Sequence, residues 1–121
     1  MTSAHPDAAR PRQGEVWAFA PSIAGRAAPS SLGPDLVLVV SNSRDNAMLP
    51  HIAVLPVANA PATDLTVLLE VGDPRPGMTV DVTRGRTIPK RWLVSCEGSV
   101  TRKKMREVFA AEVQYRCPEP E

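Results

Sequence analysis

The alternation of hydrophobic and polar residues predicts a fold built mainly from short strands. In residues 64–71 every second side chain is aliphatic, which gives this strand one apolar face. Residues 36–42 begin with five consecutive aliphatic side chains, a pattern typical of a central strand covered on both faces. Shorter patterns predict further strands at residues 14–20, 51–57, 78–82, 84–90 and 92–96.

One stretch near the C-terminus has helical spacing instead. Met105, Val108, Phe109 and Val113 recur at the intervals of a helix and are expected to share one apolar face. Thr101 stands before them as a suitable N-cap, and a proline just beyond the stretch ends the helix. The pattern therefore predicts a single C-terminal helix.

Two connections differ from ordinary turns. Residues 21–34 form a long loop rich in Ser, Ala, Gly and Pro, and loops of that length are usually functional or mobile. Residues 43–50 form a polar connection with room for one helical turn before Pro50. Both connections lie next to predicted central strands.

The 121 residues correspond to one domain. Residues 1–13 read as a flexible N-terminal arm, residues 14–116 as the domain and residues 117–121 as a tail. Six or seven short strands followed by one helix predict a mainly β protein, a small β-barrel with the helix packed on it.

Composition excludes several classes of protein. No apolar run reaches the roughly 20 residues that a membrane span needs, and no signal peptide is visible, so we expect a cytoplasmic protein. Two cysteines and two histidines do not form a metal-binding cluster, and no glycine-rich phosphate loop is present. We therefore expect no metal and no cofactor. Cys96 is expected to be buried and reduced.

Charge is distributed unevenly along the chain. The net charge is +1, but residues 82–106 carry eight basic side chains against one acidic side chain. A local cluster of this size can bind phosphate groups in a salt-sensitive manner. Within it, we expect the basic residues at the helix start to be solvated and Trp92 to lie in the core rather than to stack on a base.

Several segments together resemble the MazF/PemK/Kid toxins. Residues 13–17 resemble the R-G-[ED]-[VI]-[WY] opening of that family, and residues 37–42 resemble its second strand. Residues 86–90 resemble its [RK]-[TS]-[IV]-x-K segment. The match extends over residues 13–115 and implies an SH3-like barrel with a C-terminal helix, in agreement with the predicted elements.

The resemblance also implies an activity. Members of the family are typically homodimeric endoribonucleases that pair with a cognate antitoxin and cut single-stranded RNA without a metal. The 2′-hydroxyl attacks its own phosphate and leaves a 2′,3′-cyclic phosphate and a 5′-hydroxyl. Besides the catalytic pair, the residues expected to bind RNA are Ser41, Asn42, Arg84, Arg86, Thr87 and Lys90.

Both catalytic positions of the family are replaced in this chain. The family's arginine position is occupied by Asp35, and its threonine or serine position by Ala58. A carboxylate repels a phosphate and lacks the donors of a guanidinium. Arg26 in the long loop and Arg84 are the candidate replacements, with Asp35 then acting as a general base or as the partner of the incoming arginine.

Three functions therefore remain open. The first is a MazF-type endoribonuclease. The second is a catalytically degenerate relative that binds RNA, an antitoxin or another protein without cutting. The third is a toxin related to CcdB that acts on DNA gyrase through protein contacts.

Overall fold

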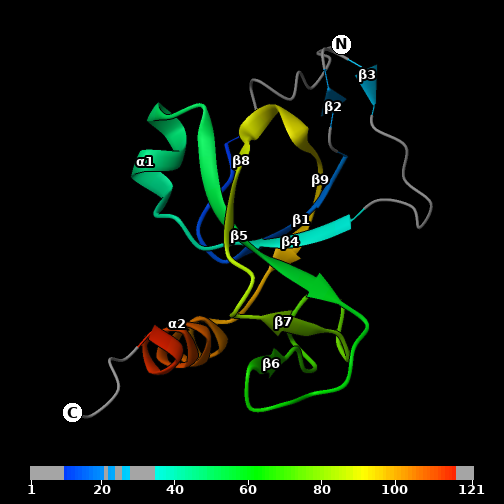
Figure 1. Cartoon of the computed structure of the whole chain (residues 1–121), viewed down its shortest axis with the longest axis vertical. Coiled ribbons are helices and arrows are strands. Elements are labelled where there is room, and N and C mark those ends of the chain that lie inside the picture. Colours follow the sequence, from blue (N-terminus) through cyan, green and yellow to red (C-terminus); the bar gives the residue numbers. More distant parts are fainter. Residues whose placement is uncertain (1–9, 21, 24–25, 28–34, 117–121) are drawn as a thin grey trace.

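The computed structural model describes residues 10–20, 22–23, 26–27 and 35–116 (Figure 1). Its main element is a seven-stranded antiparallel sheet, in which six strands follow the order β6-β7-β5-β4-β1-β9 and β8 pairs with β5 beside β7. The strands are β1 (Glu15–Phe19), β4 (Asp35–Val39), β5 (His51–Ala58), β6 (Thr66–Leu68), β7 (Thr79–Asp81), β8 (Arg86–Pro89) and β9 (Leu93–Ser99). The predicted mainly β class is confirmed.

The predicted long loop contains two very short strands. β2 (Ser22–Ile23) pairs with β3 (Arg26–Ala27) as a small separate sheet. The prediction of an unstructured connection over residues 21–34 is therefore wrong at these four positions. Two-residue strands are too short to show an alternating pattern, because alternation needs about four residues to be visible.

The longest strand, β5, joins the two halves of the sheet. One of its sides pairs with β4, while the other pairs first with β8, over residues 51–54, and then with β7, at Val57 and Ala58. Pro56 falls between these two pairings, where its missing N–H costs no hydrogen bond. The ladder is open, with β6 and β9 as its two end strands.

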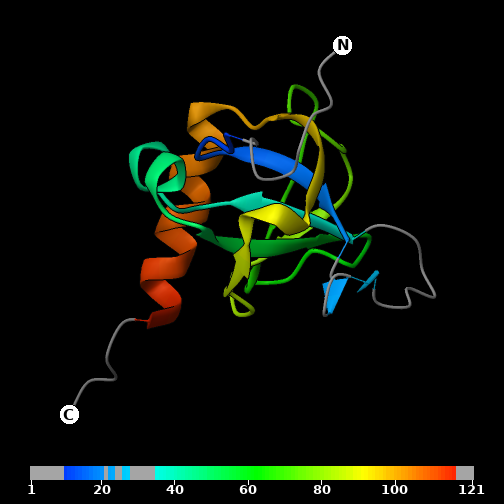
Figure 2. The same cartoon turned by 90° about the horizontal axis from the view of Figure 1, so that it is seen from above.

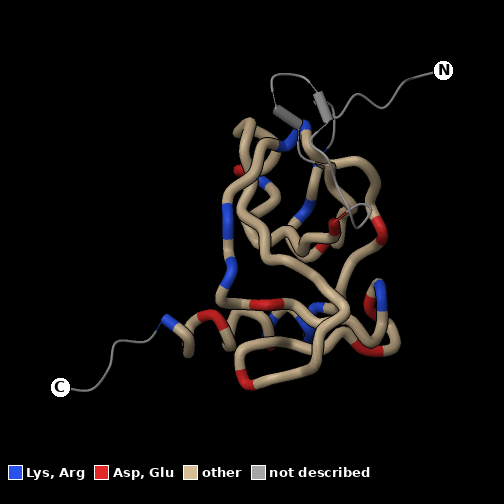
Figure 3. The backbone as a smooth tube through the Cα atoms, turned by 45° about the vertical axis from the view of Figure 1, so that its right-hand side comes forward, with Lys and Arg blue, Asp and Glu red and all other residues tan. Residues whose placement is uncertain are grey.

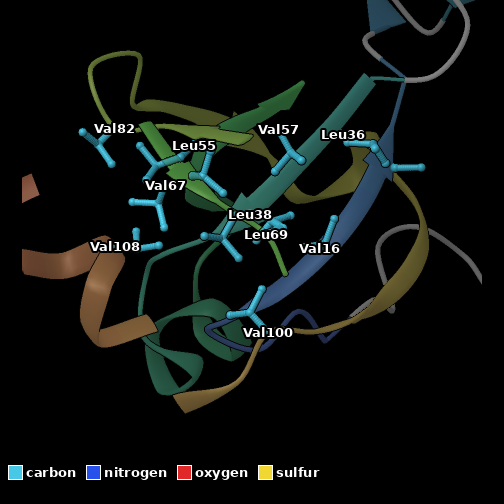
Figure 4. Packing of buried hydrophobic residues seen from close by; sticks show 12 residues of the cluster. Val16, Leu36, Leu38, Leu55, Val57, Val67, Leu69, Val82, Val100 and Val108 are labelled. Atoms are coloured by element: carbon cyan, nitrogen blue, oxygen red, sulfur yellow. The ribbon is translucent and has the colours of Figure 1, made fainter. Parts of the chain in front are cut away.

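Alternate residues of the central strands build two separate cores. The first core lies under β6, β7 and the C-terminal helix α2 (Arg102–Arg116), and Figure 4 shows it in close-up. Its buried members include Val16, Leu36, Leu38, Leu55, Val57, Val80 and Val108. The second core lies on the opposite face under β8, and consists of Phe19, Val37, Val39, Ile52, Val54, Ile88 and Leu93.

The C-terminal helix is confirmed, but its buried face differs from the prediction. The Thr101 hydroxyl accepts a hydrogen bond from the Lys104 N–H at 3.1 Å, which is the expected cap. Val108 is fully buried, whereas Val113 is 69% exposed. The C-terminal end of the helix extends past the edge of the sheet (Figure 2), and Val113 lies outside the core, although Glu112 and Arg116 still line a cavity with β5 and β8.

A buried lysine anchors the start of this helix. Lys104 is only 4% exposed, and its ammonium donates hydrogen bonds to the carboxylates of Glu70 and Glu107. Burial alone would lower the pKa of Lys104, but the two carboxylates outweigh it and raise that pKa above its usual range. The expectation that Lys104 is solvated is therefore wrong.

Asp73 completes the anchor from the β6–β7 connection. Its carboxylate is buried and accepts hydrogen bonds from the N–H groups of Glu70, at 2.9 Å, and Thr101, at 3.0 Å. The second of these bonds attaches the helix start to the turn that follows β6. The strand predicted over residues 64–71 is shorter in the structure, where β6 covers Thr66–Leu68. The predicted apolar face is also incomplete, because Leu65 is 48% and Val71 96% exposed.

Three other expectations can be compared with the structure. The helical turn predicted in residues 43–50 is present as α1 (Ser43–Met48). Cys96 is exposed on the end strand β9, so the expectation of a buried thiol is wrong; partial burial still raises the pKa of this thiol. No helix in the described part of the chain is long and apolar enough to cross a membrane.

The two ends of the predicted domain are described only in part. Residues 10–13 of the predicted arm are placed against the domain, and the Gln13 side chain donates to the Val40 carbonyl at 2.9 Å. Residues 1–9 and the predicted tail, 117–121, lie outside the described residues.

Candidate functional site

The strand register brings the two replaced catalytic positions together. Leu36 of β4 lies opposite Val57 of β5, and the next step of this antiparallel register puts Asp35 opposite Ala58. Both residues are exposed and both stand at the end of the sheet where β4 begins. Positions 35 and 58, which are 23 residues apart in sequence, therefore form one small surface.

Asp35 and Ala58 point to the face of the second core. Val37 and Val39 belong to the second core, and alternation places Asp35 on the same side of β4. Asp35 is also paired directly with Phe19 of β1, whose ring is buried in that core. The candidate surface is thus the solvent-facing rim of the second core, next to Phe19.

Arg86 reaches the same rim from β8. It pairs with Val54 and precedes Ile88 by two residues, so its side chain shares their face of the sheet. Its guanidinium carbon lies 5.5 Å from the centroid of the Phe19 ring, a cation–π arrangement that orients the side chain. Among the described residues, no carboxylate forms an ion pair with Arg86.

Arg84, one of the two candidate replacements, has a different environment. It lies in the connection between β7 and β8, its side chain is 79% exposed, and its Nε is 3.5 Å from a carboxylate oxygen of Asp81. Thr83 donates a 2.6 Å hydrogen bond to the same carboxylate, and that bond holds the pKa of Asp81 below its usual range. The other candidate, Arg26, begins β3, and its side chain lies outside what the structure describes.

Ser41 and Asn42, both predicted to bind RNA, participate in local structure. The Ser41 hydroxyl accepts from the Ala53 N–H at 3.1 Å and donates to the buried Asn46 side chain. The Asn42 side chain accepts from the Asp45 N–H at 2.9 Å and so caps the start of α1. Their polar groups position the β4–α1–β5 connection.

Lys90 and Thr87 complete the predicted set; Lys90 lies apart from Arg86, whereas Thr87 lines one cavity together with it. The Lys90 ammonium donates to the Asn46 carbonyl at 2.7 Å, behind α1. Thr87 pairs with Ala53 and therefore faces the side of β8 opposite to Arg86. There it lines a cavity of about 210 Å³ between β5, β8 and the last turns of α2.

The basic stretch of residues 82–106 is divided in space. Figure 3 shows that the Lys and Arg positions of the described residues are distributed over several parts of the molecule. The turn η2 (Lys90–Trp92) and the start of α2 lie at opposite ends in Figure 1. The basic residues of this stretch therefore do not form one phosphate-binding patch.

Trp92 packs against the second core, and its buried indole N–H has no hydrogen-bond partner among the described residues.

The described residues contain no arrangement of three His, Cys, Asp or Glu side chains suited to a metal ion. What the rim does offer is a carboxylate, a guanidinium and an aromatic ring that come from three different strands. The family resemblance groups Asp35 with Ala58, and it implies for Arg86 only a place among several RNA-binding residues. The signal for its special position is tertiary, because it depends on the Arg86 side chain lying over Phe19, a residue of another strand.

No protein-family model matches the chain, and no curated protein matches it in sequence. Its fold is nevertheless similar to that of several solved structures. One is an endoribonuclease from a mycobacterial species, with 22% sequence identity and a TM-score of 0.74 over 93% of this chain and 97% of that one. Another is an endoribonuclease in complex with its cognate antitoxin, also mycobacterial, with 21% identity and a TM-score of 0.71 over 92% and 98%.

The MazE–MazF complex from Deinococcus radiodurans gives the same result. It is 17% identical to this chain, with a TM-score of 0.70 over 92% of this chain and 99% of the other. Because each similarity covers nearly the whole of both chains, the entire described domain shares this architecture. The chain has the fold of the MazF-type endoribonuclease toxins.

Proposed function

We propose that this protein cuts single-stranded RNA at specific sequences, without a metal ion, as the toxin of a toxin–antitoxin pair. The observation that carries the proposal is the shared fold, which spans nearly the full length of proteins described as endoribonucleases. By the resemblance, Asp35 and Ala58 stand at the family's two catalytic positions, and both residues belong to the rim of the second core. In this proposal the RNA lies along that rim.

The reaction would use the ribose 2′-hydroxyl of the RNA as the nucleophile. Such a reaction needs a group that takes the 2′-hydroxyl proton and a cation that offsets the charge on the phosphorane. Arg84, Arg86 and the neighbouring basic side chains attract the phosphates. We further propose that the protein is a cytoplasmic homodimer and that it binds a cognate antitoxin. Two proteins of similar fold form complexes with antitoxins, which supports the antitoxin partner.

A second candidate function is favoured by one specific observation. By the resemblance, Asp35 and Ala58 stand at the positions of the family's arginine and its threonine or serine, and neither side chain can donate a hydrogen bond as those side chains do. A chain that had lost catalysis in this way would bind RNA or its antitoxin without cutting. The rim would then serve as a binding surface only.

One experiment separates the two functions. The purified protein is incubated with a long single-stranded RNA in EDTA, and the ends of all fragments are mapped. We expect cuts at a short recurring sequence with 2′,3′-cyclic phosphate and 5′-hydroxyl ends. Retention of intact RNA that weakens with added salt would overturn the nuclease proposal and support the binding protein.

A genetic test addresses the antitoxin. Expression of the chain alone is expected to arrest bacterial growth, and co-expression of a small upstream gene product with an acidic tail is expected to relieve the arrest. Unimpaired growth of cells that accumulate the folded protein would contradict the toxin assignment. This result would not depend on which residues cut RNA.

A further inference from the structure

We infer that Asp35 and Arg86 form a replacement catalytic pair, in which Arg86 binds the scissile phosphate and Asp35 takes the proton from the 2′-hydroxyl. This inference rests on the proposed nuclease function and assigns its reacting groups. The carboxylate occupies the position where the family has its cation, and the cation comes from a different strand.

The geometry of Phe19 brings the two groups to one place. Asp35 is the direct register partner of Phe19 across the β1–β4 pair. The Arg86 guanidinium lies over the ring of the same Phe19, at 5.5 Å from its centroid. Asp35 therefore neighbours Phe19 through the strand register and Arg86 through its guanidinium, and the two come from strands that are not adjacent, since β5 lies between β4 and β8.

The Phe19 ring also holds Arg86 in a defined orientation. Phe19 is 3% exposed, so its ring is fixed by the second core. A guanidinium stacked on a fixed ring loses less conformational freedom on binding a phosphate than a freely mobile one. Its donors remain available because, within the described residues, no salt bridge or side-chain hydrogen bond engages Arg86.

The alternative cation, Arg84, is less suited to this role. Its side chain is extended into solvent from a turn, and it is already beside the Asp81 carboxylate. A phosphate bound to Arg84 would lie close to the Asp81 carboxylate, which would repel it. Among the described residues no carboxylate forms an ion pair with Arg86, which lies only two residues away in the sequence.

In the proposed step, the 2′-oxygen forms a bond to phosphorus and the bond from phosphorus to the 5′-oxygen breaks. The 2′-hydroxyl proton passes to the Asp35 carboxylate. The leaving 5′-oxygen takes a proton from water, and Asp35 later returns its proton to solvent. Arg86 donates to the non-bridging oxygens, where negative charge increases in the transition state. Ala58 leaves the space beside Asp35 open to the ribose.

Single-turnover cleavage of a short RNA that spans a mapped site tests the pair. At saturating protein, Arg86→Ala should slow cleavage by about 100- to 1,000-fold. Arg86→Lys should recover part of the rate, because it restores the charge without the planar donors. Asp35→Asn should slow cleavage by about 100-fold or more, since an amide cannot accept the proton.

Two further variants serve as comparisons. Arg106→Ala removes an exposed positive charge from α2 and should leave the rate unchanged. Arg84→Ala should weaken RNA binding at low protein concentration and, at saturating protein, should lower the rate much less than Arg86→Ala does. Thermal unfolding of each variant establishes that a lost rate is not a lost fold, and the conservative variants Arg86→Lys and Asp35→Asn carry the test if an alanine variant unfolds.

The outcomes distinguish the inference from the function on which it rests. If the wild-type protein cuts RNA and the folded Arg86 and Asp35 variants cut at the same rate, the assigned pair is wrong and the nuclease function stands. The same holds if Arg84→Ala or Arg26→Ala abolishes cleavage instead. If the wild-type protein does not cut at all, the proposed function itself fails.

Discussion

The charged groups on the two faces of the sheet are arranged in opposite ways. On the side of the first core, the Lys104 ammonium donates to the Glu70 and Glu107 carboxylates, and the Asp73 carboxylate accepts from two backbone N–H groups. On the rim of the second core, Asp35 is exposed and neither it nor Arg86 belongs to an ion pair among the described residues. Charges that complete each other inside the molecule stabilise the fold, whereas charges left open at a rim can act on a ligand.

This contrast separates residues that look equivalent in the sequence. Lys104 and Arg86 both belong to the basic stretch, but Lys104 is buried between two carboxylates and cannot meet a phosphate. Arg86 lies over an aromatic ring with its donors unused. Only the second residue can contribute to binding RNA, so removal of the two side chains should affect different properties.

The largest effect on stability should come from leaving the buried lysine without its partners. The double variant Glu70→Gln/Glu107→Gln should lower the free energy of unfolding by about 3 kcal/mol, somewhat below the usual cost for a fully buried pair, because the carboxylates are partly exposed. Urea unfolding measures the change. Adding Lys104→Met to the double variant should restore most of the loss, and a double variant as stable as wild type would contradict the anchor.

The second-largest loss of stability should come from removing the Asp73 carboxylate. Asp73→Ala removes the acceptor for two backbone N–H groups and should cost about 2 kcal/mol of unfolding free energy. Asp73→Asn keeps one acceptor oxygen and should cost less. The neighbouring Val71, which is 96% exposed, provides the matched control, since Val71→Ala should change the unfolding midpoint very little. Equal midpoints for Asp73→Ala and Val71→Ala would contradict the role of the carboxylate.

Arg86→Ala should behave in the opposite way to these variants. It removes one exposed cation–π contact, so the unfolding free energy should fall by only about 0.5–1 kcal/mol. The same variant is expected to lose most RNA cleavage. A loss of several kcal/mol would place Arg86 among the structural charges and remove the contrast between the two faces.

The fold was largely predictable because its elements follow local patterns. The strands at residues 36–42 and 51–57 and the final helix are visible as runs and periodicities that burial imposes. The errors lie where tertiary contacts decide. Val113 has the right spacing but extends beyond the sheet, and Lys104 is buried because two carboxylates approach it, one of them from residue 70.

The candidate site was predictable only in part. Motif order relates positions 35 and 58 to one site, and the register is consistent with that placement. The proximity of Arg86 to Phe19 depends on how far β8 crosses over the sheet, which no local pattern encodes. Likewise, Ser41 and Asn42 carry polar groups that suit RNA, but only the structure shows the hydrogen bonds that those groups already make.

The smallest predicted effect concerns Asp81, at the end of β7 and beside Arg84. The hydrogen bonds from Thr83 lower the folded pKa of Asp81 below its ordinary value of 3.8, so their contribution to stability is present above that value and is lost as the pH falls through the folded pKa. Thr83→Ala removes the side-chain donor and should cost a few tenths of a kcal/mol at pH 6, and the difference from wild type should become smaller as the pH falls through the folded pKa of Asp81. NMR titration of Asp81 should show a higher pKa in the variant. If the pKa of Asp81 is the same in the variant, Arg84 rather than the Thr83 hydroxyl lowers it. Asp81 then belongs with the exposed charges of the rim and not with those that stabilise the fold.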